Sequence, residues 1–463
     1  MENLAPLMFL GLVVFLLLGY PVAFALAANG LLFAGIGIAA GLFDVSLLHA
    51  LPERVYGIVA NPTLLAIPFF AFMGLILERS GMAEDLLDTI GQLFGSLRGG
   101  LAYAVVLVGG LLAATTGVVA ATVIAMGLIS LPVMLRHGYD RRLAAGVIAA
   151  SGTLAQIVPP SLVLIVLADQ LGASVGDMYQ GALVPGLGLV VLYLAFVFLV
   201  TLIRPEAAPA LPVSARTLHG PALLRRVFTT LLPPLVLIFL VLGTIFLGVA
   251  TPTEGGAMGA AGALLLAWAR GRFTRLQLTQ ATDSTTRLTT FVIFILIGST
   301  IFTLVFRGLD GDTWVEHLFA QLPGGVLGFL VAVNLMVFVL AFFLDFFEIA
   351  FIVVPLVAPI AAKLGIDPIW FGVMLAVNMQ TAFMHPPFGF ALFYLKSVAP
   401  KTIRTGDIYW GAIPFLVIQL LMVAVVLAVP QVVLHDAPAS ASSVSEVPLD
   451  VDPDANFLPR EWR

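Results

Sequence analysis

Two proline pairs stand in the middle of long apolar runs, Pro159-Pro160 and Pro386-Pro387. Proline has no backbone N–H and clashes with the preceding helical turn, so a tandem pair predicts an interrupted helix. An interruption inside a membrane frees carbonyl oxygens that can coordinate a sodium ion, and it leaves a helix N-terminus that can face an anion. Both segments are therefore candidate binding segments, and a simple proline kink is the structural alternative.

Polar residues flank both interruptions. They are Thr153, Gln156 and Ser161 around the first, and Asn378, Gln380, Thr381 and His385 around the second. A single proline with one polar neighbour would favour a kink, whereas duplicated pairs with several polar neighbours favour a binding site. Among these residues His385 could titrate, although a hydrogen-bonded structural histidine is the favoured interpretation.

Two further apolar stretches are interrupted near their middle. Thr115-Thr116-Gly117 interrupts Gly99–Leu135, where the hydroxyl oxygens could bind a cation or bond back to the preceding turn. Asp345 interrupts Val326–Ala362, and a carboxylate at membrane depth is costly enough to indicate a role. It could cap the returning helix together with Glu348, bind a cation or carry a proton. The residue types leave these alternatives open.

The composition indicates a membrane protein and excludes several functions. Of 463 residues, 60% are hydrophobic and 10% are charged, whereas soluble domains carry roughly 25% charged residues. The absence of cysteine excludes disulfides, zinc–thiolate sites and thiol catalysis. No basic stripe, Walker A loop, HExxH or GxSxG is present, so nucleic-acid binding, ATP-driven transport and enzymatic activity are not expected. An intramembrane enzyme is only a remote alternative.

A membrane helix needs about 20 apolar residues. On that basis we expect an all-α polytopic protein with an interfacial helix in Asp44–Ala60 and ten crossings. The expected crossings are Leu4–Ala23, Phe24–Gly41, Pro62–Leu77, Arg142–Ala168, Gly181–Ile203, Thr229–Gly248, Gly255–Ala269, Leu288–Phe306, Pro368–Leu395 and Trp410–Leu434. The two interrupted stretches could each be two crossings or one re-entrant hairpin, and hairpins are favoured because buried irregular backbone is tolerated there.

The positive charges orient the chain. With the N-terminus outside, all but five of the 21 lysines and arginines fall in inner loops, as the positive-inside rule requires. The exceptions are Arg54, Arg307, Lys363, Arg460 and Arg463. Ten crossings then place both termini in the periplasm of a bacterial inner-membrane protein. Residues 435–463 form an acidic, Ser/Pro/Ala-rich segment that we expect to be a disordered periplasmic tail.

The two halves of the chain match at an offset of about 227 residues. Leu131-Pro132 through Pro159-Pro160 corresponds to Ala358-Pro359 through Pro386-Pro387, and the Asp177–Ala182 hexamer recurs as Asp407–Ala412. Each half has five expected crossings, and an odd number inverts the second half. An inverted repeat with paired broken helices is the signature of a secondary transporter whose site lies between the halves.

The broken segments Gly152–Ser161 and Gln380–Gly389 resemble those of the large membrane subunit (DctM type) of tripartite ATP-independent periplasmic (TRAP) transporters. Ala66–Phe70, Thr251–Glu254 and Gly365–Pro368 resemble this family too, and the similarity extends to about Leu434. The resemblance implies sodium-driven uptake of a small organic anion such as a carboxylate, by an elevator-type movement of a transport domain against a scaffold. It implies two partners, a separate small four-helix membrane subunit and a soluble periplasmic substrate-binding protein, and no organic cofactor. A stand-alone divalent-anion/sodium symporter is the alternative.

The resemblance also implies two sodium sites, each between a hairpin tip and a broken helix. The first would use Thr116 and Val119 with Ala155, Val158 and Pro160, and Thr115 is added as a hydroxyl candidate. The second would use Asp345 with Asn378, Thr381 and Met384. The candidate substrate ligands are Thr153, Gln156, Ser161, Gln380 and His385.

These expectations divide the chain as follows: 1–98 first-half scaffold and arm helices; 99–180 first hairpin and broken helix; 181–228 scaffold helix and cytoplasmic linker; 229–325 second-half scaffold and arm helices; 326–408 second hairpin and broken helix; 409–434 last helix; 435–463 periplasmic tail.

Overall fold

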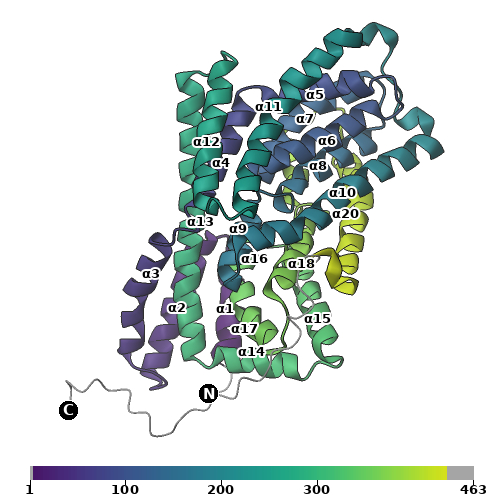
Figure 1. Ribbon diagram of the computed structural model, residues 1–463. Coiled ribbons are helices and arrows are strands. Elements are labelled where there is room, and N and C mark those ends of the chain that lie inside the picture. Colours follow the sequence, from purple (N-terminus) through teal and green to yellow (C-terminus); the bar gives the residue numbers. More distant parts are fainter. Residues whose placement is uncertain (1–3, 435–463) are drawn as a thin grey trace.

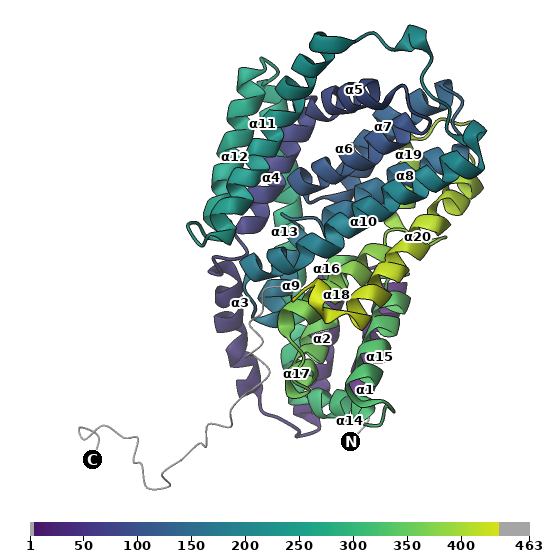
Figure 2. The same ribbon diagram turned by 45° about the vertical axis from the view of Figure 1, so that its right-hand side comes forward.

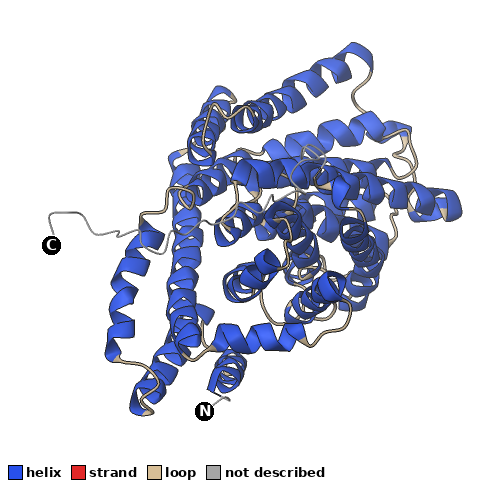
Figure 3. Ribbon diagram, turned by 60° about the horizontal axis from the view of Figure 1, so that its bottom comes forward, coloured by secondary structure: helices blue, strands red, loops and turns tan. Residues whose placement is uncertain are grey.

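A computed structural model describes residues 4–434, apart from the side chains of Thr116 and Ala320. Every regular element in this part of the chain is a helix, as Figure 3 shows. The expected periplasmic tail, 435–463, lies outside the described residues. The all-helical prediction is therefore confirmed for the described chain.

Long helices pack side by side along one edge of the molecule (Figure 1). The longest, α13 (Arg275–Gly308), contacts α2 (Val22–Ala39), α3 (Leu51–Val59) and α4 (Ala66–Arg79). α12 (Pro252–Ala269) packs on α4 as well. α1 (Leu4–Leu17) pairs with α2, and α11 (Gly220–Phe246) pairs with α12.

Glycine permits the close approach of these helices. A Cβ atom at Gly259 of α12 would lie 2.5 Å from Sδ of Met73 on α4, and one at Gly298 of α13 would overlap the backbone of Ala23 on α2. Helices in membranes associate through such small residues because lipid supplies no hydrophobic driving force between them. α12 starts with a reciprocal cap, in which the Thr251 hydroxyl accepts from the Glu254 N–H and the Glu254 carboxylate accepts from the Thr251 N–H.

The two predicted hairpins have different forms. The first is a helix pair, α6 (Gly100–Thr116) and α7 (Val119–Arg136), joined through Gly117 at φ 58°. The second contains α15 (Gly325–Leu340), α16 (Phe346–Ile352) and α17 (Val354–Lys363), and its returning arm bends by 51°. Pro355 lies in the first turn of α17, where it has no N–H to continue the hydrogen-bond ladder of α16. This bend was not predicted.

Both proline pairs interrupt their helices, which confirms the prediction made from them. α8 (Arg141–Thr153) passes through a short 3-10 turn (Leu154–Gln156) before α9 (Leu162–Leu171) begins. α18 (Pro368–Thr381) ends eight residues before α19 (Phe390–Val398). The Pro159-Pro160 and Pro386-Pro387 peptide bonds are both cis.

α8 and α18 lie at the centre of the molecule, covered by neighbouring helices. α6 and α7 both pack on α8, and α10 (Val175–Ile203) runs beside them (Figure 2). α20 (Thr405–Ala428) packs on both α8 and α18. A Cβ at Gly146 of α8 would overlap the carbonyl of Gly411 on α20, so that contact requires glycine.

Two short helices were missed by the search for apolar runs. α5 (Met82–Phe94) turns 61° away from α4, and α14 (Gly311–Ala320) follows α13. Both carry several charged residues, so neither produces an apolar run of crossing length. The expected interfacial segment is present as a 3-10 helix (Val45–Ala50) followed by α3.

By length and composition, six of the described helices can cross a bilayer, or eight if the bent pairs α4–α5 and α16–α17 each count as one span. The sequence predicted ten crossings. Part of the difference arises because α8/α9 and α18/α19 are each two short helices. α1 has 14 residues, which rise only about 21 Å against a hydrocarbon core of about 30 Å.

Candidate functional site

The first interruption is buried, and the second is buried as far as His385, whereas Pro387 and Phe388 are exposed. Residues 151–161 around the first and 376–385 around the second are all buried. Non-helical backbone at membrane depth is stable only when it is buried in protein or lines a polar cavity, because lipid cannot satisfy its hydrogen bonds.

Each interrupted helix starts from a capping carboxylate. Asp140 accepts from the N–H groups of Arg142 and Leu143, and Asp367 accepts from those of Ile369 and Trp370.

The two interruptions meet at a hydrogen bond between Thr153 and Gln380. The Gln380 side-chain amide donates to Oγ1 of Thr153 at 3.2 Å, across 227 residues of sequence. The Thr153 hydroxyl in turn donates to the carbonyl of Ala150, 2.8 Å away. Two candidates proposed from separate segments are therefore adjacent in space.

Two residues that sequence analysis missed extend this network. Nε2 of Gln419, on α20, donates to Thr153 at 3.2 Å and to the Tyr193 hydroxyl of α10 at 2.9 Å. Gln419 and Tyr193 are both fully buried. Each is the one polar residue of a long apolar stretch, 181–200 for Tyr193 and 411–428 for Gln419, and that isolation was the sequence signal for it.

Several polar atoms in this region have no partner among the described residues. They include both amide atoms of Gln156, Oε1 of Gln380 and Oε1 of Gln419. A buried amide without partners costs on the order of 1–3 kcal/mol, so such atoms are rare unless they serve a ligand or a water. Gln156 is fully buried. Ser161, at the other side of the first interruption, donates its hydroxyl to the Gln156 carbonyl.

The first hairpin tip adjoins the first interruption. A Cβ atom at Gly117 would lie 3.1 Å from Cγ of Leu162 and 3.7 Å from the carbonyl oxygen of Pro160. Thr115 donates its hydroxyl to the carbonyl of Leu112 at 2.8 Å, so the back-bonded alternative is the one present. Its oxygen keeps lone pairs for a cation. The side chain of Thr116 lies outside the described structure. Val119 begins α7, which no side chain caps.

The remaining candidates of the first sodium site, Ala155, Val158 and Pro160, lie within the buried interruption. Each would have to contribute a backbone carbonyl, since their side chains have no polar atom. Among the described residues no group of three or more His, Asp or Glu side chains could hold a metal. A site of carbonyl and hydroxyl oxygens has the ligand chemistry of a hard, weakly bound cation such as sodium.

The second hairpin tip is held by Asp345. The Asp345 carboxylate accepts from the Glu348 N–H at 2.9 Å, and the Glu348 carboxylate accepts from the Asp345 N–H at 2.9 Å. This is the reciprocal cap that starts α16. Of the three roles considered for Asp345, capping is present in the structure, and cation binding stays a prediction.

Asn378 and Thr381 lie on the last turn of α18. Nδ2 of Asn378 donates to the carbonyl and to Oδ1 of Asn334 on α15, at 2.8 and 2.9 Å, and its own Oδ1 has no partner among the described residues. The Thr381 hydroxyl donates to the Asn378 carbonyl, and Met384 is buried in the turn that follows. Asn334 was not predicted, although it joins the second hairpin to the second interruption.

His385 was expected to be a hydrogen-bonded structural residue, and this expectation is wrong. The residue is fully buried, yet neither ring nitrogen has a hydrogen-bond partner among the described residues. Its ring packs against Phe338 and Phe342, with centroids 4.3 and 4.4 Å apart. This aromatic contact could not be predicted, because both phenylalanines lie more than 40 residues away from His385 in the sequence.

The two hairpin tips border one small cavity of about 230 Å³. Its lining comes from the first tip, from the second tip, from α13 and from the segment around the second interruption: Gly117, Val118, Val119, Ala120, Leu162, Leu288, Phe291, Asp345, Phe346, Phe347, Phe383 and Tyr394. Of the predicted site residues, Val119 and Asp345 line it. The network around Thr153 and Gln380 lies outside this lining.

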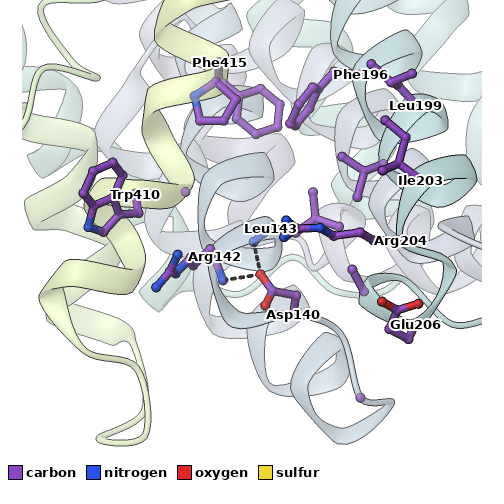
Figure 4. Close-up of a pocket in the computed structure, with 15 residues that line it drawn as sticks. Asp140, Arg142, Leu143, Phe196, Leu199, Ile203, Arg204, Glu206, Trp410 and Phe415 are labelled. Atoms are coloured by element: carbon purple, nitrogen blue, oxygen red, sulfur yellow. Dashed lines mark hydrogen bonds between the residues drawn. The ribbon is translucent and has the colours of Figure 1, made fainter.

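A larger cavity of about 610 Å³ lies elsewhere, where the start of α8 and of α20 meet the end of α10 (Figure 4). Phe196 and Phe415 form its apolar wall, whereas Arg142, Arg204 and Glu206 lie toward its other side. None of the predicted site residues lines this cavity. Size alone therefore does not identify the functional site.

Comparison with known proteins agrees with the resemblance found in the motifs. The family model described as "Tripartite ATP-independent periplasmic transporter, DctM component" matches residues 9–432. The C4-dicarboxylate TRAP transporter large permease protein DctM of Pseudomonas aeruginosa is 33% identical over 395 residues, which cover 85% of this chain and 90% of that protein. The sialic acid TRAP transporter large permease protein SiaM of Vibrio cholerae is 27% identical, with 88% of this chain and 95% of that protein covered.

Among solved structures, the YdaH transporter of Alcanivorax borkumensis has a similar fold. The TM-score is 0.59 at 17% sequence identity, and the match covers 84% of this chain and 89% of that one. At this identity the likeness concerns the fold alone.

Proposed function

Since the chain belongs to the DctM family of tripartite ATP-independent periplasmic transporters and is a large permease subunit rather than an enzyme, we propose that it carries a small organic anion across the bacterial inner membrane, driven by sodium. The observation that carries the proposal is the contact between Thr153 and Gln380. It joins two interrupted helices beside buried amide atoms that have no hydrogen-bond partner in the described part of the chain.

The substrate would be held by the polar groups around this contact. Gln156 and Gln380 offer amide donors and acceptors, and Thr153 and Ser161 offer hydroxyls close by. Amide N–H groups satisfy a carboxylate without adding a fixed charge. His385 would add a ring nitrogen from the second interruption, since neither of its nitrogens has a hydrogen-bond partner among residues 4–434 as described. The names of the relatives, which include C4-dicarboxylate and sialic acid permeases, support an anionic substrate.

The first sodium ion would bind between the first hairpin tip and the first interruption. The proximity of Gly117 to Leu162 and Pro160 supports this location, because it brings the end of α6 against unwound backbone. Thr115, Thr116 and Val119 would supply oxygens from the tip. Ala155, Val158 and Pro160 would supply carbonyls from the interruption.

The second sodium ion would bind between Asp345 and the last turn of α18. Asn378 Oδ1 has no partner there, and Asn378, Thr381 and Met384 all lie at the end of the helix, where carbonyl oxygens lose their intrahelical donors. Sodium ions at both positions would offset the negative charge of the substrate. Transport of the substrate would then be coupled to transport of sodium.

An elevator movement and an inverted repeat are part of the proposal. Their support is the order of elements. In α1–α10 and again in α11–α20, a group of helices is followed by a hairpin, an interrupted helix and a long helix. The cavity between the hairpin tips is also bordered by Leu288 and Phe291 of the long helix α13. Such a boundary is where a transport domain would slide against a scaffold.

The proposed partners follow from family membership. A separate small four-helix membrane subunit would complete the scaffold, and a soluble periplasmic protein would deliver the substrate. Both termini would face the periplasm. The isethionate relative of Oleidesulfovibrio alaskensis is named DctMQ, and this chain covers 65% of its length.

Uptake into proteoliposomes tests the function. The chain would be reconstituted with its small subunit, and entry of a labelled carboxylate would be followed with the cognate binding protein present. We expect uptake under an inward sodium gradient and little uptake when choline replaces sodium at equal ionic strength. Uptake that is indifferent to sodium would reject the coupling. Sodium-driven uptake without the binding protein would instead identify a stand-alone symporter.

A further inference from the structure

The cavity of about 610 Å³ lies where α8, α10 and α20 reach one face of the membrane. α10 has 29 residues and is about 43 Å long, whereas the hydrocarbon core of a bilayer is about 30 Å thick. Arg204 directly follows α10, and Arg142 lies in the first turn of α8. Charged side chains are costly in the hydrocarbon core, so these two arginines place the cavity at the level of the lipid headgroups.

One side of this cavity continues into the exposed apolar surface of α10 and α20. Leu199 and Ile203 of α10 line the cavity and are 51% and 67% exposed, and Trp410 of α20 is 63% exposed. Both helices are long and apolar enough to cross a bilayer, so we expect acyl chains to lie against these side chains. Tryptophan is enriched at the boundary between hydrocarbon and headgroups because its ring is amphipathic. The cavity is therefore accessible to lipid from the bilayer.

The lining changes from apolar to charged along one direction (Figure 4). Phe196 and Phe415, whose rings meet edge to face at 5.0 Å, form the apolar end. Arg142 and Arg204 follow in the direction of the helix ends, and Glu206 lies beyond them. A glycerophospholipid has its groups in the same order, namely acyl chains, a phosphate and a polar headgroup.

The charges of the lining are balanced. Two arginines face two carboxylates, those of Asp140 and Glu206. The guanidinium of Arg204 and the carboxylate of Glu206 have no hydrogen bond or ion pair with another described residue, and Nε of Arg142 is 4.0 Å from the Asp407 carboxylate. Complementary charges favour a ligand that carries both signs over a ligand that is only anionic.

We propose that this cavity binds a zwitterionic phospholipid with a free ammonium group, of the phosphatidylethanolamine type. Arg142 and Arg204 bind its phosphate, as arginines do in basic pockets between membrane helices. The ammonium group donates hydrogen bonds to Glu206, and the acyl chains leave along Leu199 and Ile203. The lipid thereby joins α8, α10 and α20. This inference goes beyond the proposed function, because it depends on neither substrate nor sodium.

Lipid binding to the full chain, purified with its small subunit in detergent, tests the proposal. Phosphatidylethanolamine, phosphatidylcholine and phosphatidylglycerol with identical acyl chains are added separately. Native mass spectrometry measures the bound lipid, and the melting temperature measures the stabilisation. We expect phosphatidylethanolamine to bind at least about tenfold more tightly than the others. Phosphatidylcholine has no ammonium N–H to donate, and phosphatidylglycerol has no cationic group. Equal affinities, or tighter binding of phosphatidylglycerol, would overturn the proposal.

Three variants locate the site. Arg204→Gln removes a phosphate contact, and we expect about tenfold weaker binding of phosphatidylethanolamine. Glu206→Gln should lower the affinity for phosphatidylethanolamine to that for phosphatidylcholine, and leave the latter unchanged. Arg275→Gln changes an exposed arginine at the start of α13, outside the cavity lining, and should have no effect. Unaltered lipid affinities in both Arg204→Gln and Glu206→Gln would show that the lipid does not bind here.

The soluble headgroup separates a lipid site from a site for a small phosphate ester. Glycerophosphoethanolamine carries the same phosphate and ammonium groups without acyl chains. We expect it to leave the melting temperature unchanged at concentrations at which the lipid raises it. If it stabilises the protein as strongly as the lipid does, the ligand is a soluble phosphate ester and the lipid assignment is wrong. Sodium-coupled transport is unaffected by that result.

Discussion

Gln156 is the residue whose surroundings most directly indicate a ligand, because both atoms of its buried amide lack a partner among the described residues. Gln419 is also fully buried but differs in its hydrogen bonds. Its Nε2 donates to both Thr153 and Tyr193. We therefore expect Gln156 to bind a ligand and Gln419 to stabilise the fold.

Replacing each glutamine with leucine tests this distinction. Gln156→Leu removes no internal hydrogen bond of that side chain, so we expect an unchanged melting temperature and at least about tenfold slower uptake. Gln419→Leu leaves the Tyr193 hydroxyl without its donor, and we expect it to lose about 1–3 kcal/mol of stability. Thermal melting and initial uptake rates measure the two effects. A Gln156→Leu protein that is destabilised but transports normally would show that Gln156 stabilises the fold and does not bind a ligand.

Asp345 can be a helix cap and a sodium ligand at once, and two substitutions distinguish these roles. Asparagine caps a helix about as well as aspartate, so Asp345→Asn should keep the stability of the hairpin. Without the carboxylate charge, sodium affinity is expected to fall about tenfold. Asp345→Ala should additionally lose about 1 kcal/mol of stability through the missing cap.

Sodium affinity is measured for the unaltered protein and for both variants from the rise in melting temperature with increasing sodium concentration. If Asp345→Asn responds to sodium as the unaltered protein does, Asp345 only caps α16.

At the residue scale, sequence reasoning located the polar residues at the interruptions but not their partners. Thr153 and Gln380 stood out because they flank duplicated proline pairs. Asn334 and Gln419 did not, since a single amide in an apolar helix has no periodicity or motif to mark it. The environment of His385 was also inaccessible, because the phenylalanines around it come from another segment of the chain.

The first hairpin tip is the element on which the proposed sodium sites depend most. Gly117 has φ 58°, and Gly172, after α9, has φ 63°. A side chain at either position costs roughly 1–2 kcal/mol in backbone conformation. They differ in surroundings, because a Cβ at Gly117 would meet Leu162 and Pro160, whereas one at Gly172 would meet nothing within 4 Å.

This pair provides a matched test of the tip. Gly117→Ala and Gly172→Ala should lower the melting temperature by similar amounts, because the backbone cost is shared. Only Gly117→Ala should weaken sodium binding and slow uptake, because it pushes the tip away from the interrupted helix. Comparable uptake by the two variants would mean that the contact between the tip and the interruption does not matter for transport.

At the element scale, apolar length and proline predicted most of the long helices, both interruptions and a break within each of the two long apolar stretches. Apolar length and proline missed two kinds of feature, namely short charged helices and one bend. α5 and α14 are short and charged, so they lie below the threshold of a hydrophobicity search. The bend between α16 and α17 depends on packing in the returning arm as well as on Pro355, and packing is not visible in composition.

At the scale of the whole molecule, segments from the two halves of the chain meet at two places. The Thr153–Gln380 bond joins the first interruption to the second, and the first and second tips border the same cavity. If cation and anion bind within this shared region, each must strengthen the binding of the other. Thermodynamic linkage requires both affinities to change by the same factor, whatever path the movement takes.

Reciprocal binding of sodium and carboxylate to the purified permease complex is the most direct measurement. Calorimetry would give the affinity for a transported carboxylate with and without sodium, and the affinity for sodium with and without that carboxylate. We expect both affinities to rise by the same factor, on the order of tenfold. Equal carboxylate affinity in sodium and in choline would contradict a shared site for cation and anion.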